Sequence, residues 1–385
     1  MKISPHSLHA SVLKAPEHKE LVAGRLATIA AGRFSAQIQQ APLVVAPPSI
    51  DIPITTVSLN YNFDAYINVG FRGGTALSAA LIVDSGNYSL IVPDYSVISG
   101  LPNFQTDYTI LADNVTEPWG CPAVILRGPI ELPTATGGFY EIPDCVFYAC
   151  TGTNSNGELT ANFGAGCLSP WIAASGITLK PPLACIQDYP YVEFNYAPAQ
   201  QMFAAGSNPT LTEASLTLYQ TMPPGYQVFD ILKNLEWMSL VPRSLTIGGT
   251  ETGWPGTLAS PIAMVDTGGG PVFLSDPNGY VYNKNWPDPV TSPEWTAGSI
   301  SCESTKDDIA IELADANGSF SYHIDPTTLP ASVQGLTLVM CEQCQYMMSE
   351  NGMNIGGLSA LFNYILIDYA SAKVGFKAKT PGAGT

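Results

Sequence analysis

The chain of 385 residues is long enough for two or three domains, each with a sizeable core. Its residues are 46% hydrophobic and 12% charged, with 35 Gly and 32 Pro, which favours a β-rich globular protein over a helical bundle or a disordered chain. No stretch approaches 18 consecutive apolar residues, so the sequence argues against a membrane-spanning helix.

The acidic charge is unevenly distributed along the chain. The net charge is −17 at pH 7. Residues 1–50 carry five basic and two acidic side chains, a net +3, whereas the remainder carries ten basic and thirty acidic ones, a net −20. Such a body repels nucleic acid and anionic membranes, so we expect neither as a partner. It loses most of its self-repulsion when its carboxylates are protonated, which is compatible with an acidic working environment.

The expected elements begin with an amphipathic helix over 21–40 and an extended, Pro-rich boundary over 41–53. Short apolar runs separated by Gly, Pro and Asn then predict strands over 55–61, 65–71, 76–84, 123–132, 146–150, 215–221, 243–249, 262–266, 309–315, 319–324, 336–340 and 364–369. Few helices are expected in this region, one over 226–237 and a short one over 358–364. The fold class is therefore all-β.

Eight cysteines suit disulfide bonds and an oxidising compartment, although spacing does not reveal their connectivity. The first twenty residues, MKISPHSLHASVLKAPEHKE, lack the apolar core of a secretory signal. The cysteine count nevertheless favours a secreted or extracytoplasmic protein. Cys341-Glu-Gln-Cys344 has a zinc-ligand spacing, but the chain has no second cysteine pair of this kind, and neither a metal nor another cofactor is expected.

Two strings 182 residues apart show an internal duplication. In "AALIVDSGNYSLIVPD" (79–94) and "SPIAMVDTGGGPVFLSD" (260–276), an apolar run leads into Asp-Ser/Thr-Gly and is followed by a second apolar run. A Gly-centred string follows each of them, "NFGAGCLSP" (162–170) and "NIGGLSALF" (354–362). A repeated order at this separation indicates duplication at the scale of a domain.

The duplication suggests a pair of catalytic carboxyl groups. A carboxylate at the end of a buried strand is costly unless it is paired, hydrogen-bonded or protonated. If the two halves face each other, Asp84 and Asp266 meet and hold one proton between them. The ionised member can then activate a water molecule while the protonated member polarises a carbonyl group.

The residues after each aspartate are the expected supports of this pair. Ser85 and Thr267 would hold the two loops by hydrogen bonds. Gly86 and Gly268 would permit tight turns, because glycine has no Cβ.

Over most of residues 55–377 the sequence resembles the pepsin-like aspartic proteases. Residues 68–93 are similar to the family's first active-site hairpin and loop, and residues 244–276 to the second. Residues 354–378, NIGGLSALFNYILIDYASAKVGFKA, resemble its C-terminal signature, and GAGCLSP (164–170) matches a first-lobe loop more weakly.

The resemblance implies a bilobal, double-lobe acid-protease fold, with one lobe over 51–220 and the other over 221–385. It implies a monomer that hydrolyses a polypeptide bound extended in the inter-lobe cleft, with Asp84 and Asp266 as catalytic residues and no cofactor. Residues 1–50 are then a prosegment that makes the protein a zymogen. The alternative for these residues is an extra helix or a disordered arm.

The resemblance also places a disulfide bond in the C-terminal lobe. Cys302 would pair with Cys341 or with Cys344.

The sequence departs from the family pattern at three places. Asn87 and Gly269 stand where the family has Ser or Thr, whose hydroxyl contacts the catalytic carboxylate. The family's flap Tyr-Gly pair is missing; Trp119-Gly120 is the nearest substitute, ahead of Tyr108. Asn87 also begins a glycosylation sequon, and a glycan there would block the aspartate pair.

These departures leave two alternatives to an aspartic endopeptidase. One is a pepsin-like protein that has lost proteolysis and serves as a binding or inhibitor module. The other reuses the Asp84–Asp266 pair for proton transfer on a small molecule.

Overall fold

The computed structural model describes residues 48–379 apart from several gaps. The gaps are 55, 59–63, 73–74, 77–79, 167–170, 197–213, 233–237, 257–260, 270–271, 276–287, 290–301, 330–337 and 342–351. The expected helix over 21–40 and the proposed prosegment lie outside the described residues. The described part of the chain is all-β with a few short helices, as the sequence predicts.

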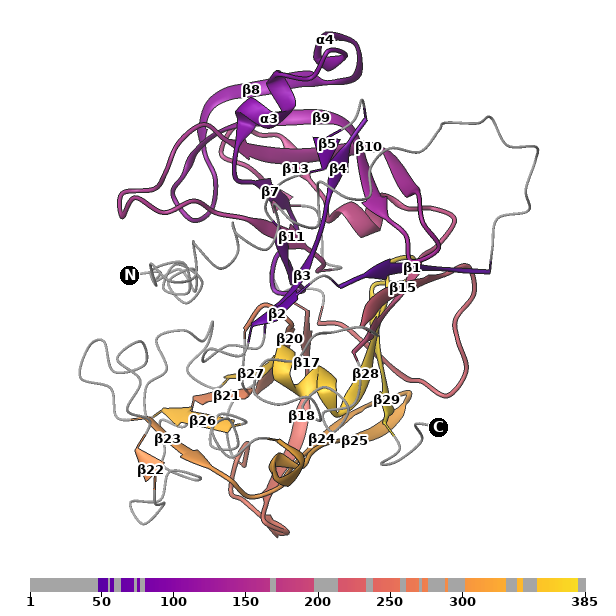
Figure 1. The fold of residues 1–385 in the computed structure, drawn as a ribbon. Helices are drawn as coiled ribbons and strands as arrows, with labels where there is room; N and C mark the ends of the chain where they lie inside the picture. Colours follow the sequence, from indigo (N-terminus) through magenta and orange to yellow (C-terminus); the bar gives the residue numbers. More distant parts are fainter. Residues whose placement is uncertain are drawn as a thin grey trace.

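The first half of the chain forms a ten-stranded sheet, which fills the upper, purple part of Figure 1. Its order is β2-β3-β6-β11-β7-β10-β9-β4-β5, and β8 pairs with β9. The strands are β2 (Thr56–Ser58), β3 (Asp64–Ile67), β4 (Gly70–Phe71), β5 (Thr75–Ala76), β6 (Leu81–Asp84), β7 (Leu90–Val92), β8 (Thr109–Thr116), β9 (Pro122–Pro133), β10 (Phe139–Cys150) and β11 (Asn162–Gly164). A two-stranded sheet accompanies it, β12 (Trp171–Ile172) with β13 (Thr178–Leu179).

The second half forms a seven-stranded and a four-stranded sheet in the lower, orange part of Figure 1. The seven-stranded order is β17 (Ser239–Leu240), β20 (Ile262–Asp266), β27 (Gly352–Gly356), β21 (Val272–Ser275), β26 (Leu338–Cys341), β23 (Cys302–Thr305) and β22 (Asp288–Pro289). The four-stranded order is β19 (Thr250–Glu251), β18 (Pro242–Ile247), β24 (Ile309–Asp315) and β25 (Gly318–Ile324).

A six-stranded antiparallel sheet joins the two halves. Its order is β1 (Ser49–Pro53), β15 (Ser215–Tyr219), β14 (Tyr191–Asn195), β28 (Asn363–Asp368), β29 (Lys373–Ala378) and β16 (Gln227–Asp230). Its middle pair joins β14, from the first half of the chain, to β28, near the C-terminal end of the described residues. In Figure 1 the β1–β15 and β28–β29 pairs lie at the junction of the two halves.

The helices of the described residues are short. They are α3 (Tyr95–Ser99), α4 (Phe104–Asp107) and the 3-10 helices η1 (Pro182–Cys185), η2 (Pro326–Thr328) and η3 (Gly357–Leu361). In the part of the chain that the structure describes, no helix is long and apolar enough to cross a membrane.

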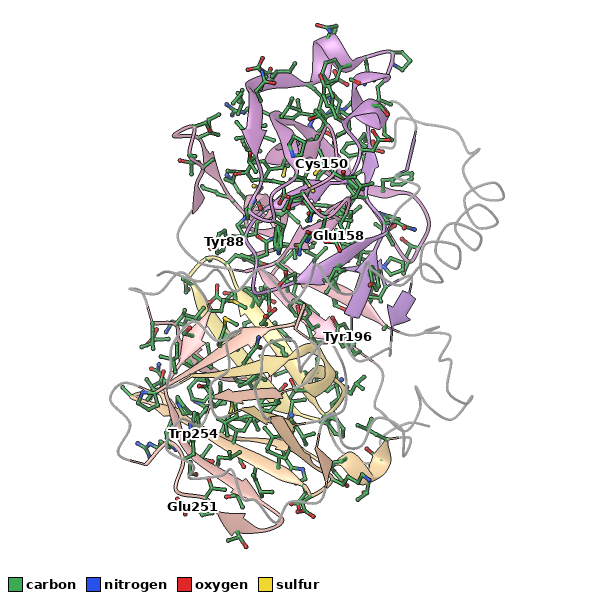
Figure 2. The ribbon with its side chains drawn as sticks, turned by 90° about the vertical axis from the view of Figure 1, so that its left-hand side faces the viewer. Tyr88, Cys150, Glu158, Tyr196, Glu251 and Trp254 are labelled. Atoms are coloured by element: carbon green, nitrogen blue, oxygen red, sulfur yellow. The ribbon has the colours of Figure 1, made fainter. Side chains whose placement is uncertain are left out.

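Burial explains the strand sequences. β6 is buried at every position, because it lies between β3 and β11 inside its sheet, which accounts for its unbroken apolar run. β25 alternates between buried and exposed positions, as a strand with one solvated face does. One large core cluster extends through both halves, and Trp254 is its largest fully buried side chain. Figure 2 shows Trp254 in the lower half and Cys150 in the upper half.

All twelve predicted strands overlap strands of the structure, but the helix predicted over 226–237 is wrong for its first part. Residues 227–230 form β16, which pairs with β29 in the register Gln227↔Phe376. The apolar side chain of Phe229 packs on Phe376 with ring centroids 6.0 Å apart. Tertiary pairing therefore overrides a weak helical pattern. The helix predicted over 358–364 is realised as η3 and gives way to β28 at Asn363.

Cys302 and Cys341 are direct cross-strand partners in the antiparallel pair of β23 and β26. The pairing proposed from the family resemblance therefore has a compatible backbone register. No two cysteines of the described part of the chain lie at disulfide distance, and Cys121, Cys145, Cys150 and Cys185 are free thiols.

Candidate active site

Asp84 and Asp266 end two strands that have the same surroundings in the two halves. β6 ends at Asp84 and pairs in parallel with β11, where Asp84 is opposite Gly164. β20 ends at Asp266 and pairs in parallel with β27, where Asp266 is opposite Gly356. A third strand, β7 or β21, then pairs antiparallel with β11 or β27. The sequence duplication is therefore a structural repeat around the two carboxyl groups.

The two aspartate loops are joined by reciprocal hydrogen bonds. The Ser85 amide donates to Thr267 Oγ1 at 3.0 Å, and the Thr267 amide donates to Ser85 Oγ at 2.9 Å. Each hydroxyl then donates across the junction, Ser85 Oγ to the Val265 carbonyl and Thr267 Oγ1 to the Val83 carbonyl, both at 3.0 Å. Ser85 and Thr267 therefore hold the two loops together.

The carboxyl groups of Asp84 and Asp266 lie next to each other and hydrogen-bond. Gly86 N donates to Asp84 Oδ1 at 2.8 Å, and Gly268 N donates to Asp266 Oδ1 at 3.1 Å. A Cβ on Gly86 would lie 2.6 Å from Asp266 Cγ, and one on Gly268 would lie 2.5 Å from Asp84 Cγ. Both positions therefore require glycine because the opposite carboxyl group occupies the space.

The pair is shielded from solvent. Asp84 is 1% exposed and Asp266 is 7% exposed. Burial raises the pKa of Asp84, while hydrogen bonds from Asp266, Asn162 and the Gly86 amide act in the opposite direction. Two carboxyl groups this close retain one proton between them. The site can therefore present an acid and a base side by side.

Two asparagines that the sequence analysis did not assign complete the site. Asn162 Nδ2 donates to Asp84 Oδ2 at 2.7 Å, and Asn354 Nδ2 donates to Asp266 Oδ2 at 2.8 Å. Both are buried, and each stands two residues before the glycine opposite its aspartate. The repeated Asn-apolar-Gly triplets, Asn-Phe-Gly and Asn-Ile-Gly, were the signal that could have revealed them.

Asn162 and Asn354 also explain the residues that follow the two Asp-Ser/Thr-Gly triplets, Asn87 and Gly269. The Asn87 amide donates to Asn162 Oδ1 at 2.7 Å, so Asn87 supports the donor that contacts Asp84. A Cβ on Gly269 would lie 2.9 Å from Asp266 Oδ2 and 3.0 Å from Asn354 Nδ2. Any side chain at Gly269 must therefore displace the carboxylate or the asparagine that serves it.

The buried position of Asn87 also bears on its sequon. Its side chain is 5% exposed and bonded within the site. The folded protein therefore has no room for a glycan at Asn87.

Trp119, the flap candidate, lies in the turn between β8 and β9. The buried Glu117 organises this turn, because its carboxylate accepts hydrogen bonds from the Trp119 amide at 2.8 Å and the Cys121 amide at 2.7 Å. Trp119 packs against a second, smaller core cluster around Ile125 and Tyr148. Its role as a flap stays a prediction.

Tyr108, the weaker flap candidate, is buried in the main core, and its hydroxyl donates to the Pro129 carbonyl at 2.9 Å. This position gives Tyr108 a structural role.

Neither a scan of family models nor a search of curated proteins finds a match to this chain. Among the described residues, no three His, Cys, Asp or Glu side chains are grouped so that they could hold a metal ion. The candidate site is therefore defined by its geometry, as a buried Asp84–Asp266 pair with a symmetric set of donors.

Thr267→Ala should lower the free energy of unfolding by about 3 kcal/mol, because it leaves the buried Ser85 amide and Val83 carbonyl without their partner. Thr267→Ser keeps the hydroxyl and should cost less than half as much. Urea denaturation of both variants tests this. Equal losses in both would show that the Thr267 methyl group, and not the hydroxyl, stabilises the junction.

The protein should be more stable at pH 4 than at pH 7. Burial raises the pKa of Asp84 and that of Glu117, so each binds its proton more tightly when folded. Their contribution is complete below the unfolded pKa values, near 4, and is lost as the pH rises through the folded values. Urea midpoints at the two pH values measure the difference.

Glu117→Gln should reduce this difference, since it removes one of the carboxyl groups whose pKa is raised by burial. Asp144→Asn is the control, because an ion pair with Arg127 lowers the pKa of Asp144. An unchanged difference in Glu117→Gln would contradict the assignment to this carboxyl group.

Proposed function

We propose that this chain is an aspartic endopeptidase with the bilobal architecture of the pepsin-like family. The observation that carries the proposal is the hydrogen-bonded pair of Asp84 and Asp266, held at the junction of two equivalent strand-loop units. The strand repeat, the reciprocal loop bonds and the joining six-stranded sheet support a two-lobed molecule. Its substrate is a polypeptide bound extended between the lobes.

In the proposed mechanism Asp84 is the acid and Asp266 the base. Burial favours the protonated form of Asp84, which donates to the carbonyl oxygen of the scissile peptide. Asp266 takes a proton from a water molecule, whose oxygen attacks the carbonyl carbon. On collapse of the tetrahedral intermediate, Asp266 passes its proton to the leaving nitrogen and Asp84 regains its own.

The surrounding donors set the orientation of both carboxyl groups. Each aspartate receives a backbone amide on Oδ1 and an asparagine amide on Oδ2. These donors fix the planes of the two carboxyl groups, so the groups need little reorganisation during proton transfer. Asn162 and Asn354 thereby replace the hydroxyl groups that the family carries after its Asp-Thr/Ser-Gly triplets. Asn87 and Gly269 are consistent with an active pair for this reason.

The negative body of the protein supports an acidic working range. Its net charge of −17 at pH 7 falls in magnitude as carboxylates are protonated. The raised pKa of Asp84 acts in the same direction, because a general acid must hold its proton at the working pH.

Asp266→Asn should lower the rate of peptide hydrolysis by roughly 10³-fold, because it removes the base that activates water. The assay is digestion of an unfolded protein between pH 3 and pH 7, with a statine-type inhibitor as a second probe. Folding should persist, since the change removes one of two crowded carboxyl groups. Asp144→Asn removes an exposed carboxylate from the same protein and should leave the rate unchanged.

The same assay separates the alternatives. A binding or inhibitor module would hold its ligand equally well before and after Asp266→Asn and would digest nothing. Reuse of the pair on a small molecule would give inhibitor-sensitive turnover of that molecule without peptide cleavage. Either result would overturn the endopeptidase proposal.

Asn162→Leu should move the basic limb of the kcat/KM profile to higher pH. The Asn162 amide lowers the pKa of Asp84, so its removal makes the acid hold its proton longer. Asn363→Leu is the matched control, because its buried amide serves the His323 carbonyl. If the limb stays in place while both variants lose stability, Asn162 supports the fold and does not tune the acid.

A further inference from the structure

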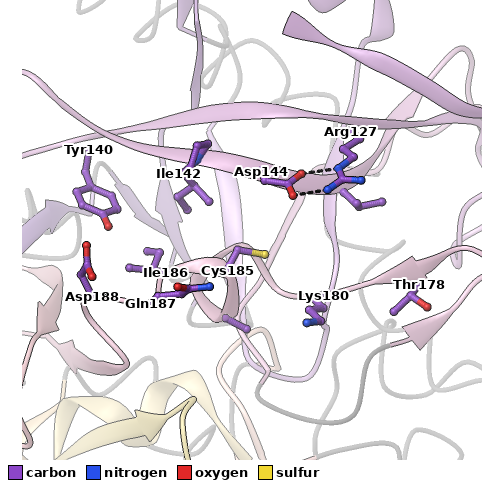
Figure 3. Close-up of a pocket in the computed structure, with 13 residues that line it drawn as sticks. Arg127, Tyr140, Ile142, Asp144, Thr178, Lys180, Cys185, Ile186, Gln187 and Asp188 are labelled. Carbon is purple, nitrogen blue, oxygen red and sulfur yellow. Dashed lines mark hydrogen bonds and ion pairs between the residues drawn. The ribbon is translucent and has the colours of Figure 1, made fainter.

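A cavity of about 650 Å³ lies in the N-terminal half, away from the aspartate pair. Its walls come from β9, β10 and the segment 178–188 that contains η1. Figure 3 shows Cys185 near the middle of the wall, with Lys180 on one side and Asp144, bonded to Arg127, above it. The lining combines charged and polar side chains with the apolar residues Ile142, Pro143, Val146, Ala184 and Ile186.

The cavity exposes one cysteine of a neighbouring pair. Cys185 lies on the wall at the end of η1 and is partly exposed. Cys145 belongs to β10 and is fully buried. η1, which carries Cys185, packs against β10, which carries Cys145, and the two thiols are close enough to affect each other's pKa. A molecule in the cavity can therefore reach Cys185 directly, whereas Cys145 is buried and does not line the cavity.

The charges around Cys185 favour its thiolate. In this structure the Cys185 thiol donates a hydrogen bond to the Pro181 carbonyl at 3.6 Å. The contact with Cys145 makes the largest contribution to lowering the pKa of Cys185 below its usual range, and Lys180 adds to the effect. Burial and Asp144 oppose it, but Asp144 is engaged with Arg127. The same contact with Cys185, together with burial, raises the pKa of Cys145. Cys185 is therefore the member of the pair that loses its proton more readily.

We propose that Cys185 is a site of thiol–disulfide exchange with small disulfides that enter this cavity, and that Cys145 is its resolving thiol. The proposal stands on the cavity, on the partly exposed position of Cys185 within it and on the packing of η1 against the strand that carries Cys145. It is independent of the Asp84–Asp266 chemistry.

The exchange proceeds in two balanced steps. The Cys185 thiolate attacks one sulfur of a small disulfide such as oxidised glutathione, forming a mixed disulfide and releasing one glutathione thiolate. Cys145 then loses its proton and attacks the Cys185 sulfur of the mixed disulfide. This step forms the Cys145–Cys185 bond and releases the second glutathione, so the protein loses two electrons and the small disulfide gains them.

The chain contains a matched control pair, Cys121 and Cys150. Both are buried in the second core cluster, and both contact Thr160. Burial raises the pKa of each thiol. They should therefore be protected from reagents that modify Cys185.

Alkylation of the reduced protein with N-ethylmaleimide tests the exposed thiol. Peptide mass spectrometry should show Cys185 modified more than about tenfold faster than Cys121 or Cys150, because only Cys185 combines access with thiolate character. Lys180→Gln should slow the reaction at Cys185, and Asp144→Asn should accelerate it. Similar rates at Cys185 and Cys121 would overturn the proposal.

Incubation with oxidised glutathione tests the resolving thiol. The wild type should yield a Cys145–Cys185 cross-link, identified by fragmentation of the joined peptides. Cys145→Ser should stop at the mixed disulfide on Cys185, whereas Cys150→Ser should still form the cross-link. If the wild type retains glutathione on Cys185 as Cys145→Ser does, Cys145 is not the resolving thiol.

Slow alkylation of Cys121 reports that each of these variants is folded. If Cys145→Ser does not fold, Cys185→Ser replaces it, and the glutathione adduct and the cross-link should then both be absent. A glutathione adduct on Cys145 in that variant would contradict the assignment of Cys185 as the entry thiol.

Discussion

The reciprocal hydrogen bonds between Ser85 and Thr267 are the interaction on which the candidate site depends. Each hydroxyl accepts an amide of the opposite loop and donates to a carbonyl behind it, so all four bonds form together. They set the separation of the loops, and that separation lets each aspartate occupy the space over the opposite glycine. A shift of one loop would therefore break the bonds and separate the carboxyl groups at once.

Burial of the carboxyl pair connects stability with chemistry. Shielding from solvent raises the pKa of Asp84, and so the group that stabilises the fold in acid is also the proposed proton donor. The asparagine donors moderate this cost by bonding the outer oxygens. A fully apolar surround would hold the proton more tightly but would leave Asp266 a poor base.

The all-β class and the positions of Asp84 and Asp266 could be predicted from the sequence, because strand patterns and a duplicated triplet are local signals. The roles of Asn162 and Asn354 could not, since their partners lie 78 and 88 residues away in the chain. In the sequence, Gly269 indicates the loss of a hydroxyl group that would contact Asp266. The structure shows why a glycine stands there, because the Asn354 amide occupies the space of a side chain. The strand over residues 227–230 could not be predicted either, because its partner β29 lies still further along the chain.

The six-stranded sheet has a consequence for how the chain is made. β14 pairs on one side with β15, but its other neighbour, β28, is synthesised much later. During translation, the first half therefore carries an open strand edge with unpaired backbone groups, which can pair with other chains. Because closing this sheet needs contacts between distant segments, its formation should be slow and late. The vulnerable period of this protein in the cell is the interval between the synthesis of β14 and the arrival of β28.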